Sequence, residues 1–154
     1  MKHLASGSKL LAWWTATGAW ALQIFWMSTS TFGGETTRSM LLGLLDAIGL
    51  ALPEVMLSAL HSLSRKAAHI GEYAVFGLLL YQSLSRRWVA AAIVAAAVYA
   101  ATDECHQLFV AGRHASLFDW GLDVAAAASA IGAVRLSLRM RKGSGNANAT
   151  PQNA

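Results

Sequence analysis

The chain has 154 residues, of which 55% are hydrophobic and 13% are charged, and its mean hydropathy is +0.42. Soluble domains carry about 25% charged residues, so this composition excludes an ordinary water-soluble fold and favours one integral membrane domain. The net charge of +4 does not indicate a nucleic-acid partner, because the basic residues lie at the ends of apolar runs rather than along one soluble face. The single cysteine, Cys105, excludes an internal disulfide.

The first apolar run covers residues 10–27 and follows a basic N-terminal segment, residues 1–9. This run is longer than the hydrophobic region of a signal peptide, which is about 7–15 residues. Because about 20 apolar residues span the hydrocarbon core of a bilayer, we predict a first transmembrane helix here.

Two short amphipathic segments follow. Apolar residues recur with the helical period, first at Leu41, Leu44, Leu45 and Ile48, and then at Leu52, Met56, Ala59, Leu60 and Leu63. Both segments are too short and too polar to cross a bilayer. We therefore predict two short helices that lie in the outer membrane interface.

Three further apolar runs predict transmembrane helices at residues 67–84, 88–109 and 117–138. The last two are rich in alanine and glycine, and the spacing of Ala128 and Gly132 predicts a close helix–helix contact. Residues 143–154 contain no core-forming residues and predict a disordered tail. The predicted fold is thus an all-α bundle of four transmembrane helices, with two short interfacial helices between the first and second spans.

Four spans place both termini on the same side of the membrane. Eight of the twelve Lys and Arg residues then share that side: Lys2, Lys9, Arg86, Arg87, Arg135, Arg139, Arg141 and Lys142. Because basic loops remain in the cytoplasm, we predict that residues 1–9 and 143–154 are cytoplasmic.

Polar residues gather near the outer ends of three predicted spans. At about 1.5 Å per residue, Glu72, Asp103 and Asp123 each lie about 8–9 Å below the outer edge of a core about 30 Å thick. Helical spacing gives each span one polar face, formed by Lys66, His69, Glu72 and Tyr73, then by Asp103, His106 and Gln107, and then by Asp119 and Asp123. Glu104 points about 100° away from Asp103. Ionisable residues in a membrane are costly and mark a functional site.

The chemistry of this cluster stays open at this point. The acids, with His69 and His106, could hold a divalent cation, or they could form a network neutralised by Lys66 and Arg113. Asp103 and Glu104 could act as an acid–base pair if their environments separate their pKa values. Arg113 could bind a phosphate or carboxylate, or it could pair with Asp119. No cofactor is indicated.

At these residues the chain resembles the VanZ-like family of small bacterial membrane proteins. The resemblance rests on Arg65–Tyr73, on Asp103–Arg113 and on the pair of Asp119 and Asp123. The lysine–histidine–tyrosine signature of the family maps to Lys66, His69 and Tyr73, its Asp-Glu-x-x-Gln motif maps to Asp103, Glu104 and Gln107, and its Gly-Arg pair maps to Gly112 and Arg113. The resemblance implies a link to teicoplanin-type glycopeptide resistance or to the cell envelope.

We therefore expect a multi-pass protein of the bacterial plasma membrane with an outward-facing polar site. Its expected partner, besides the lipid bilayer, is an anionic or lipid-linked cell-wall component. Binding residues would be Lys66, His69, Glu72, Tyr73, His106, Gln107, Arg113, Asp119 and Asp123. The alternative is a membrane enzyme that uses Asp103 and Glu104, with or without a metal, on a lipid-linked envelope substrate. Its substrate, metal and oligomeric state are not indicated by the sequence.

Overall fold

The computed structural model describes residues 2–110, 113 and 115–147, and this part of the chain is helical and contains no strand. The elements are α1 (Lys2–Met27), a 3-10 helix η1 (Ser30–Phe32), α2 (Gly34–Ala47), α3 (Glu54–Ser83), α4 (Val89–Gln107) and α5 (Leu117–Ala147). The predicted all-α class is confirmed.

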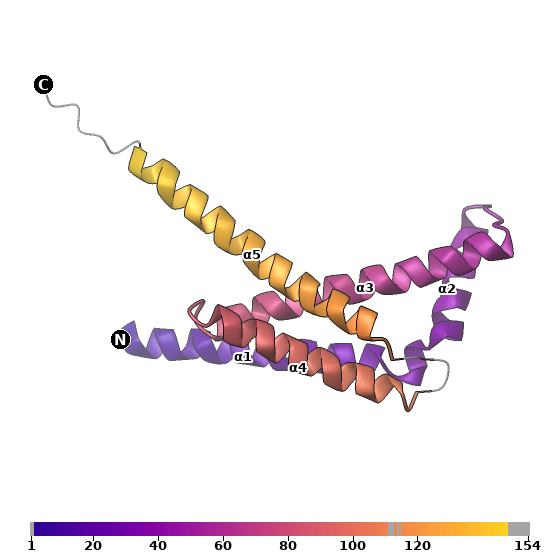
Figure 1. Ribbon diagram of the computed structural model, residues 1–154, viewed down its shortest axis with the longest axis horizontal. Coiled ribbons are helices and arrows are strands. Elements are labelled where there is room, and N and C mark those ends of the chain that lie inside the picture. Colours follow the sequence, from indigo (N-terminus) through magenta and orange to yellow (C-terminus); the bar gives the residue numbers. More distant parts are fainter. Residues whose placement is uncertain (1, 111–112, 114, 148–154) are drawn as a thin grey trace, which may run out of the picture.

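The long helices run alternately up and down (Figure 1). The N-terminal end of α1, the turn between α3 and α4 and the C-terminal end of α5 lie toward one end of the molecule, at the left of the view. Helix η1, α2 and the C-terminal end of α4 lie toward the other end. This order is the one that four spans require, although the crossing of a membrane by α1 and α3 stays a prediction.

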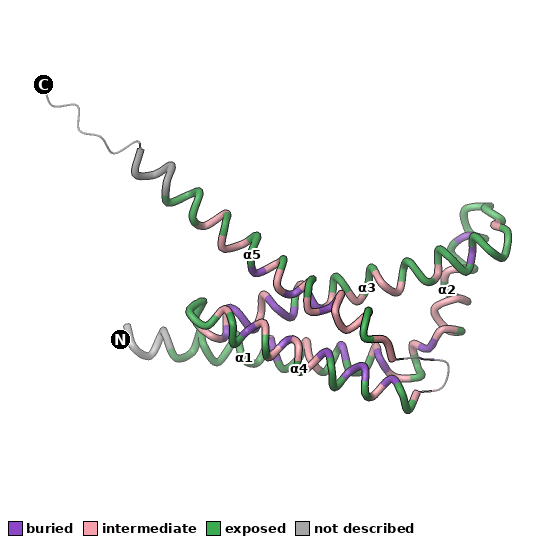
Figure 2. Tube along the Cα trace, viewed as in Figure 1, coloured by how far each residue is buried: buried purple, intermediate pink, exposed green. Residues whose placement is uncertain are grey.

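Two segments are long and apolar enough to cross a membrane: α4 and residues Leu117–Lys142 of α5. Their most apolar stretches are only 28% and 17% buried, whereas the core helix of a soluble protein would be mostly covered by protein. Figure 2 shows exposed positions along the outer side of each long helix. An apolar exterior of this kind is compatible with a lipid environment.

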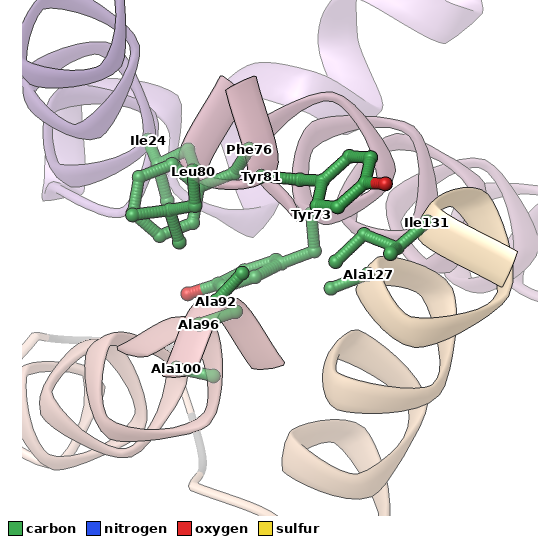
Figure 3. Packing of buried hydrophobic residues seen from close by; sticks show 10 residues of the cluster. All are labelled: Ile24, Tyr73, Phe76, Leu80, Tyr81, Ala92, Ala96, Ala100, Ala127 and Ile131. Carbon is green, nitrogen blue, oxygen red and sulfur yellow. The ribbon is translucent and has the colours of Figure 1, made fainter. Parts of the chain in front are cut away.

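The core is built from large side chains of α3 packed against small side chains of α4 and α5. Ala92, Ala96 and Ala100 are fully buried and fall at i, i+4 and i+8, so they form one stripe along α4. Tyr73 and Phe76 of α3 pack in this cluster (Figure 3). The whole cluster consists of Ile24, Tyr73, Phe76, Leu80, Tyr81, Ala92, Ala96, Ala100, Ala127 and Ile131.

Helices α3 and α5 pack closely against each other at Gly77. A methyl group placed on Gly77 would lie 2.8 Å from the Cα of Ala127, so a side chain there would force the two helices apart. The contact predicted at Ala128 and Gly132 is wrong, because Gly132 is exposed and a methyl group there meets nothing within 4 Å. The buried stripe of α5 instead runs through Asp123, Ala127 and Ile131, one residue ahead of the predicted one.

The structure corrects three predicted boundaries. The second interfacial segment and the second span are one continuous helix, α3, which runs from Glu54 to Ser83; the first interfacial segment lies largely within α2. The charged residues Arg65 and Lys66 predict the start of a span, yet both residues favour helix, and α3 continues through them. Helix α4 ends at Gln107 rather than at residue 109, and α5 continues to Ala147, into the predicted tail. Residues 148–154 of that tail lie outside the described residues.

Candidate functional site

Helices α3, α4 and α5 enclose a polar cavity of about 200 Å³. Its lining comes from one stripe of α3, from the last turn of α4 and from the first two turns of α5. The lining residues are Ser62, Arg65, Lys66, His69, Glu104, Gln107, Asp119, Leu122 and Asp123. Six of the residues predicted for the site therefore meet in one place, because the up-and-down order brings these three helix segments to the same end.

Lys66 lies at the mouth of the cavity between an acid and an aromatic ring. Its Nζ is 3.3 Å from Oδ1 of Asp119 and 5.0 Å from the centroid of the Phe118 ring. The two charged side chains are 43% and 37% exposed, so water reaches this ion pair and weakens it. The Asp119 carboxylate and the ring together fix where the ammonium group points.

A second pair lies deeper in the cavity. Nδ1 of His69 is 3.6 Å from Oδ2 of Asp123, whose side chain is 1% exposed. This distance is too long for a hydrogen bond, and neither oxygen of Asp123 has a hydrogen-bond partner among the described residues. Glu72 and Asp103 also act electrostatically on His69. Of the three carboxyls predicted to gather, those of Glu72, Asp103 and Asp123, the carboxyl of Asp123 faces the imidazole directly, and that of Glu72 lines a smaller cavity together with His69.

The two acids of α4 face different partners, as their 100° offset predicts. Oδ2 of Asp103 accepts a hydrogen bond of 3.1 Å from Nε2 of Gln107. Oε2 of Glu104 accepts a hydrogen bond of 2.7 Å from the backbone N–H of Ser116. Asp103 is thus held within α4, while Glu104 ties the end of α4 to the segment that precedes α5.

Arg113 does not pair with Asp119. Its Nη2 donates hydrogen bonds to the backbone oxygens of Met27, at 2.7 Å, and Phe32, at 3.0 Å. The side chain thereby satisfies a carbonyl at the end of α1, which has no partner within the helix. Burial lowers the pKa of Arg113 from its usual value, and Arg65 nearby acts in the same direction. With Glu72 and His69, Arg113 lines a smaller cavity of about 50 Å³.

Five predicted residues do not line the main cavity: Glu72, Asp103 and Arg113, described above, and His106 and Tyr73. The ring of His106 packs against Phe25 of α1, with 4.7 Å between the ring centroids. Tyr73 is fully buried, stacks on His69 with 6.5 Å between centroids, and its hydroxyl has no hydrogen-bond partner among the described residues. Gly112, the neighbour of Arg113 in the Gly-Arg pair, lies outside the described residues.

Sequence reasoning missed Ser62 and Arg65. Both line the cavity, and Arg65 also lines the smaller one. Within the described part of the chain, the Arg65 guanidinium has no carboxylate partner. The signal was available, because Arg65 precedes His69 by four residues and Ser62 precedes it by seven, which places all three on one helix face.

No three His, Cys, Asp or Glu side chains come together in the described residues in an arrangement that could hold a metal ion. What the cavity offers instead is two cationic groups on α3 opposite three acids of α4 and α5. Such a lining can bind an anionic group on one side and accept hydrogen bonds from hydroxyl or ammonium groups on the other.

Comparison with known proteins agrees with the resemblance in the motifs. A family model described as VanZ/LLP1 matches residues 13–138, most of the chain and every residue that lines the cavity. No curated protein and no solved structure matches the chain. On the strength of the family match, the chain belongs to the VanZ/LLP1 family.

Proposed function

We propose that this protein crosses the bacterial plasma membrane four times, with both termini in the cytoplasm, and binds the anionic group of a cell-envelope component in the cavity of α3, α4 and α5. The observation that carries the proposal is the pair of cations at the rim. Lys66 is oriented by Asp119, and Arg65 beside it has no carboxylate partner in the described residues.

The chemistry of these two side chains suits a phosphate or a carboxylate. A guanidinium presents two parallel N–H donors to such a group, and an ammonium adds a compact charge. Asp119 keeps Lys66 in place, and the acids of the cavity supply acceptors for hydroxyl groups of a ligand. Arg113, predicted to bind the anion, is occupied by two backbone oxygens, so Arg65 takes that role here.

The size of the cavity limits the bound part of the ligand. Pockets that enclose drug-sized molecules measure about 300–1,000 Å³, whereas this one measures about 200 Å³. It therefore suits a headgroup rather than a whole envelope precursor. The resemblance of the motifs to VanZ-like proteins adds the expected consequence, a change in the action of teicoplanin-type glycopeptides on the cell.

Binding accounts for the acids better than catalysis does. Asp103 and Glu104, the residues of the enzymatic alternative, already accept hydrogen bonds from Gln107 and Ser116. A general base needs to reach the proton of a substrate, yet Asp103 is not among the residues that line the polar cavity, and the contact of Glu104 with Ser116 ties α4 to the segment before α5. We therefore propose a binding protein.

The test is the affinity of the full chain, in nanodiscs of neutral lipid, for hexyl phosphate. Arg65→Gln and Lys66→Gln should each weaken binding by about tenfold or more, since a hydrogen bond to a charged group is worth about 1.5–3 kcal/mol. The matched control is Arg38→Gln, which removes an exposed cation paired with Glu54 on the same end of the molecule. Equal affinities for Arg65→Gln and Arg38→Gln would reject the proposal.

A further inference from the structure

A second, apolar cavity lies between the end of α4 and the start of α5. It measures about 300 Å³, and we call it the α4–α5 groove. Glu104 and Ser116 are its polar lining residues, and the others are Ala101, Cys105, Leu108, Ala115, Leu117 and Trp120. The indole of Trp120 is fixed in place, because its Nε1 donates a hydrogen bond of 2.9 Å to the backbone oxygen of Ala97.

The groove and the polar cavity meet at Glu104, which lines both. Adjacent residues of α5 also line the two different spaces: Asp119 lines the polar cavity, and the next residue, Trp120, lines the groove. The hydrogen bond from Ser116 to Glu104 holds the two helices together at this boundary. A charged space and an apolar space therefore share one wall.

The groove is placed where lipid could enter it. Both helices that form the groove are apolar enough to span a membrane. The groove lies where the C-terminal end of α4 meets the N-terminal end of α5. Large apolar side chains surround this end, with Leu108 exposed by 64%, Phe109 by 87% and Leu117 by 88%. Apolar side chains that protrude together mark a surface that is not covered by water alone.

From this arrangement we infer that the ligand is a single amphiphile, whose anionic headgroup occupies the polar cavity and whose hydrocarbon chain lies in the α4–α5 groove. The inference rests on the proposed function, since it assigns the same cations, Arg65 and Lys66, to the headgroup. It adds that recognition needs a chain attached to the anion. The carboxyl of Glu104 lies at the junction, where headgroup and chain join.

Cys105 supplies a reporter that needs no engineering, because it is exposed, lines the groove and is the single cysteine of the chain. The experiment measures the rate at which N-ethylmaleimide alkylates Cys105 of the full chain in nanodiscs. The added probes are dodecyl phosphate, butyl phosphate, inorganic phosphate and dodecanol. Dodecyl phosphate should slow alkylation by at least about tenfold, since it alone offers both the anion and a chain long enough to cover the thiol.

Two variants separate the two halves of the site. Arg65→Gln should raise the concentration of dodecyl phosphate needed for protection by about tenfold or more, as expected for hexyl phosphate. Ala101→Trp should fill the groove, so that dodecyl phosphate binds no more tightly than butyl phosphate, while the affinity for butyl phosphate is retained. The control is Ala91→Trp, the same change at an exposed position of α4 about 15 Å away along the helix, which should behave as the unmodified chain.

The outcomes distinguish this inference from the proposed function. If butyl and dodecyl phosphate bind equally and neither protects Cys105, the cavity binds anions and the amphiphile is rejected. If dodecanol protects as well as dodecyl phosphate, the groove takes any chain without a headgroup, and the inference is overturned. If no phosphate compound binds, the proposed function and the inference fail together.

Discussion

Asp123 occupies a position that the pattern of α5 reserves for small or apolar side chains. It precedes Ala127 and Ile131 on the buried stripe, and its carboxyl lies 3.6 Å from the imidazole of His69. A buried charge that loses its partner leaves a desolvated group uncompensated, which costs far more than the pair contributes when intact. The stability of the fold and the shape of the cavity therefore depend on the same two side chains.

His69→Gln should lower the free energy of unfolding by about 3–5 kcal/mol, because it leaves Asp123 without its facing imidazole. In the double variant His69→Gln with Asp123→Asn, the second change removes the buried charge and should recover part of that loss. The measurement is a double-mutant cycle of unfolding in detergent micelles, in which the coupling should be about 0.5–3 kcal/mol.

The exposed pair of Arg38 and Glu54 serves as the comparison for this cycle. Its side chains are 38% and 73% exposed, so Arg38→Gln should cost no more than about 1 kcal/mol. Strictly additive effects of the His69 and Asp123 substitutions would show that the two side chains do not interact.

At the scale of the helices, the crossing of α3 and α5 is set by one residue without a side chain. Gly77→Ala should push α3 away from Ala127, whose Cα would lie 2.8 Å from the new methyl group, and should cost about 1–3 kcal/mol. Thermal unfolding of the purified protein measures the effect. Gly71→Ala is the matched control on the same helix, since a methyl group there meets nothing within 4 Å; it should be neutral or slightly stabilising.

The docking of α2 on α3 should weaken in acid. Thr37 Oγ1 and His61 Nε2 are 2.7 Å apart, and partial burial, with Arg65 and Arg38 nearby, lowers the pKa of His61 from 6.5. The unfolded state therefore binds a proton at a higher pH than the folded state, so stability falls as the pH drops below about 6.5 and levels off below the lowered pKa. Hydrogen exchange of the α2 amides at pH 7 and pH 5 measures this change.

His61→Gln removes the titrating group, so the exchange of α2 in this variant should no longer depend on pH after correction for the intrinsic rate. An undiminished pH dependence in His61→Gln would assign the effect to another group.

The helices show which features a sequence pattern can supply. Apolar runs located α4 and most of α1 and α5, because length and hydropathy are local properties. The joining of the second interfacial segment to the second span in α3 was missed, since a charged pair such as Arg65 and Lys66 looks like a boundary and does not break a helix. The buried face of α5 was predicted wrongly for a related reason. Where alanine is so frequent, the sequence does not indicate which face of the helix is buried.

The candidate site divides in the same way. The i, i+4 spacing of Asp119 and Asp123 and the stripe of Lys66 and His69 follow from helical geometry, and the structure brings all four to one cavity. The contacts of Arg113 could not be predicted, because its partners are the backbone oxygens of Met27 and Phe32, and a carbonyl leaves no mark in the sequence. Likewise, the absence of a carboxylate partner for Arg65 in the described residues depends on how the helices pack, which the sequence alone does not give.

For the whole molecule, the central expectation is four crossings of the membrane. In a Cys105→Ser background, a cysteine at position 30, at the η1 end of the molecule, should react with a membrane-impermeant maleimide added outside intact cells. Cysteines in place of Arg87, in the turn between α3 and α4, and of Lys142, near the end of α5, should react only after the membrane is opened. Labelling of positions 30 and 142 from the same side would overturn the arrangement.

The unbroken course of α3 has a consequence for the membrane in which the protein works. A helix does not stretch, so the eleven residues from Lys66 to Gly77 separate the cavity mouth from the α3–α5 crossing by about 16 Å along the helix, close to half of a hydrocarbon core of about 30 Å. If α3 crosses the bilayer as proposed, with the α3–α5 crossing at its centre, the two rim cations would reach the lipid phosphates in a membrane of ordinary thickness. Longer host lipids would submerge the rim in hydrocarbon, and the affinity for hexyl phosphate should fall as the acyl chains of the nanodisc lengthen.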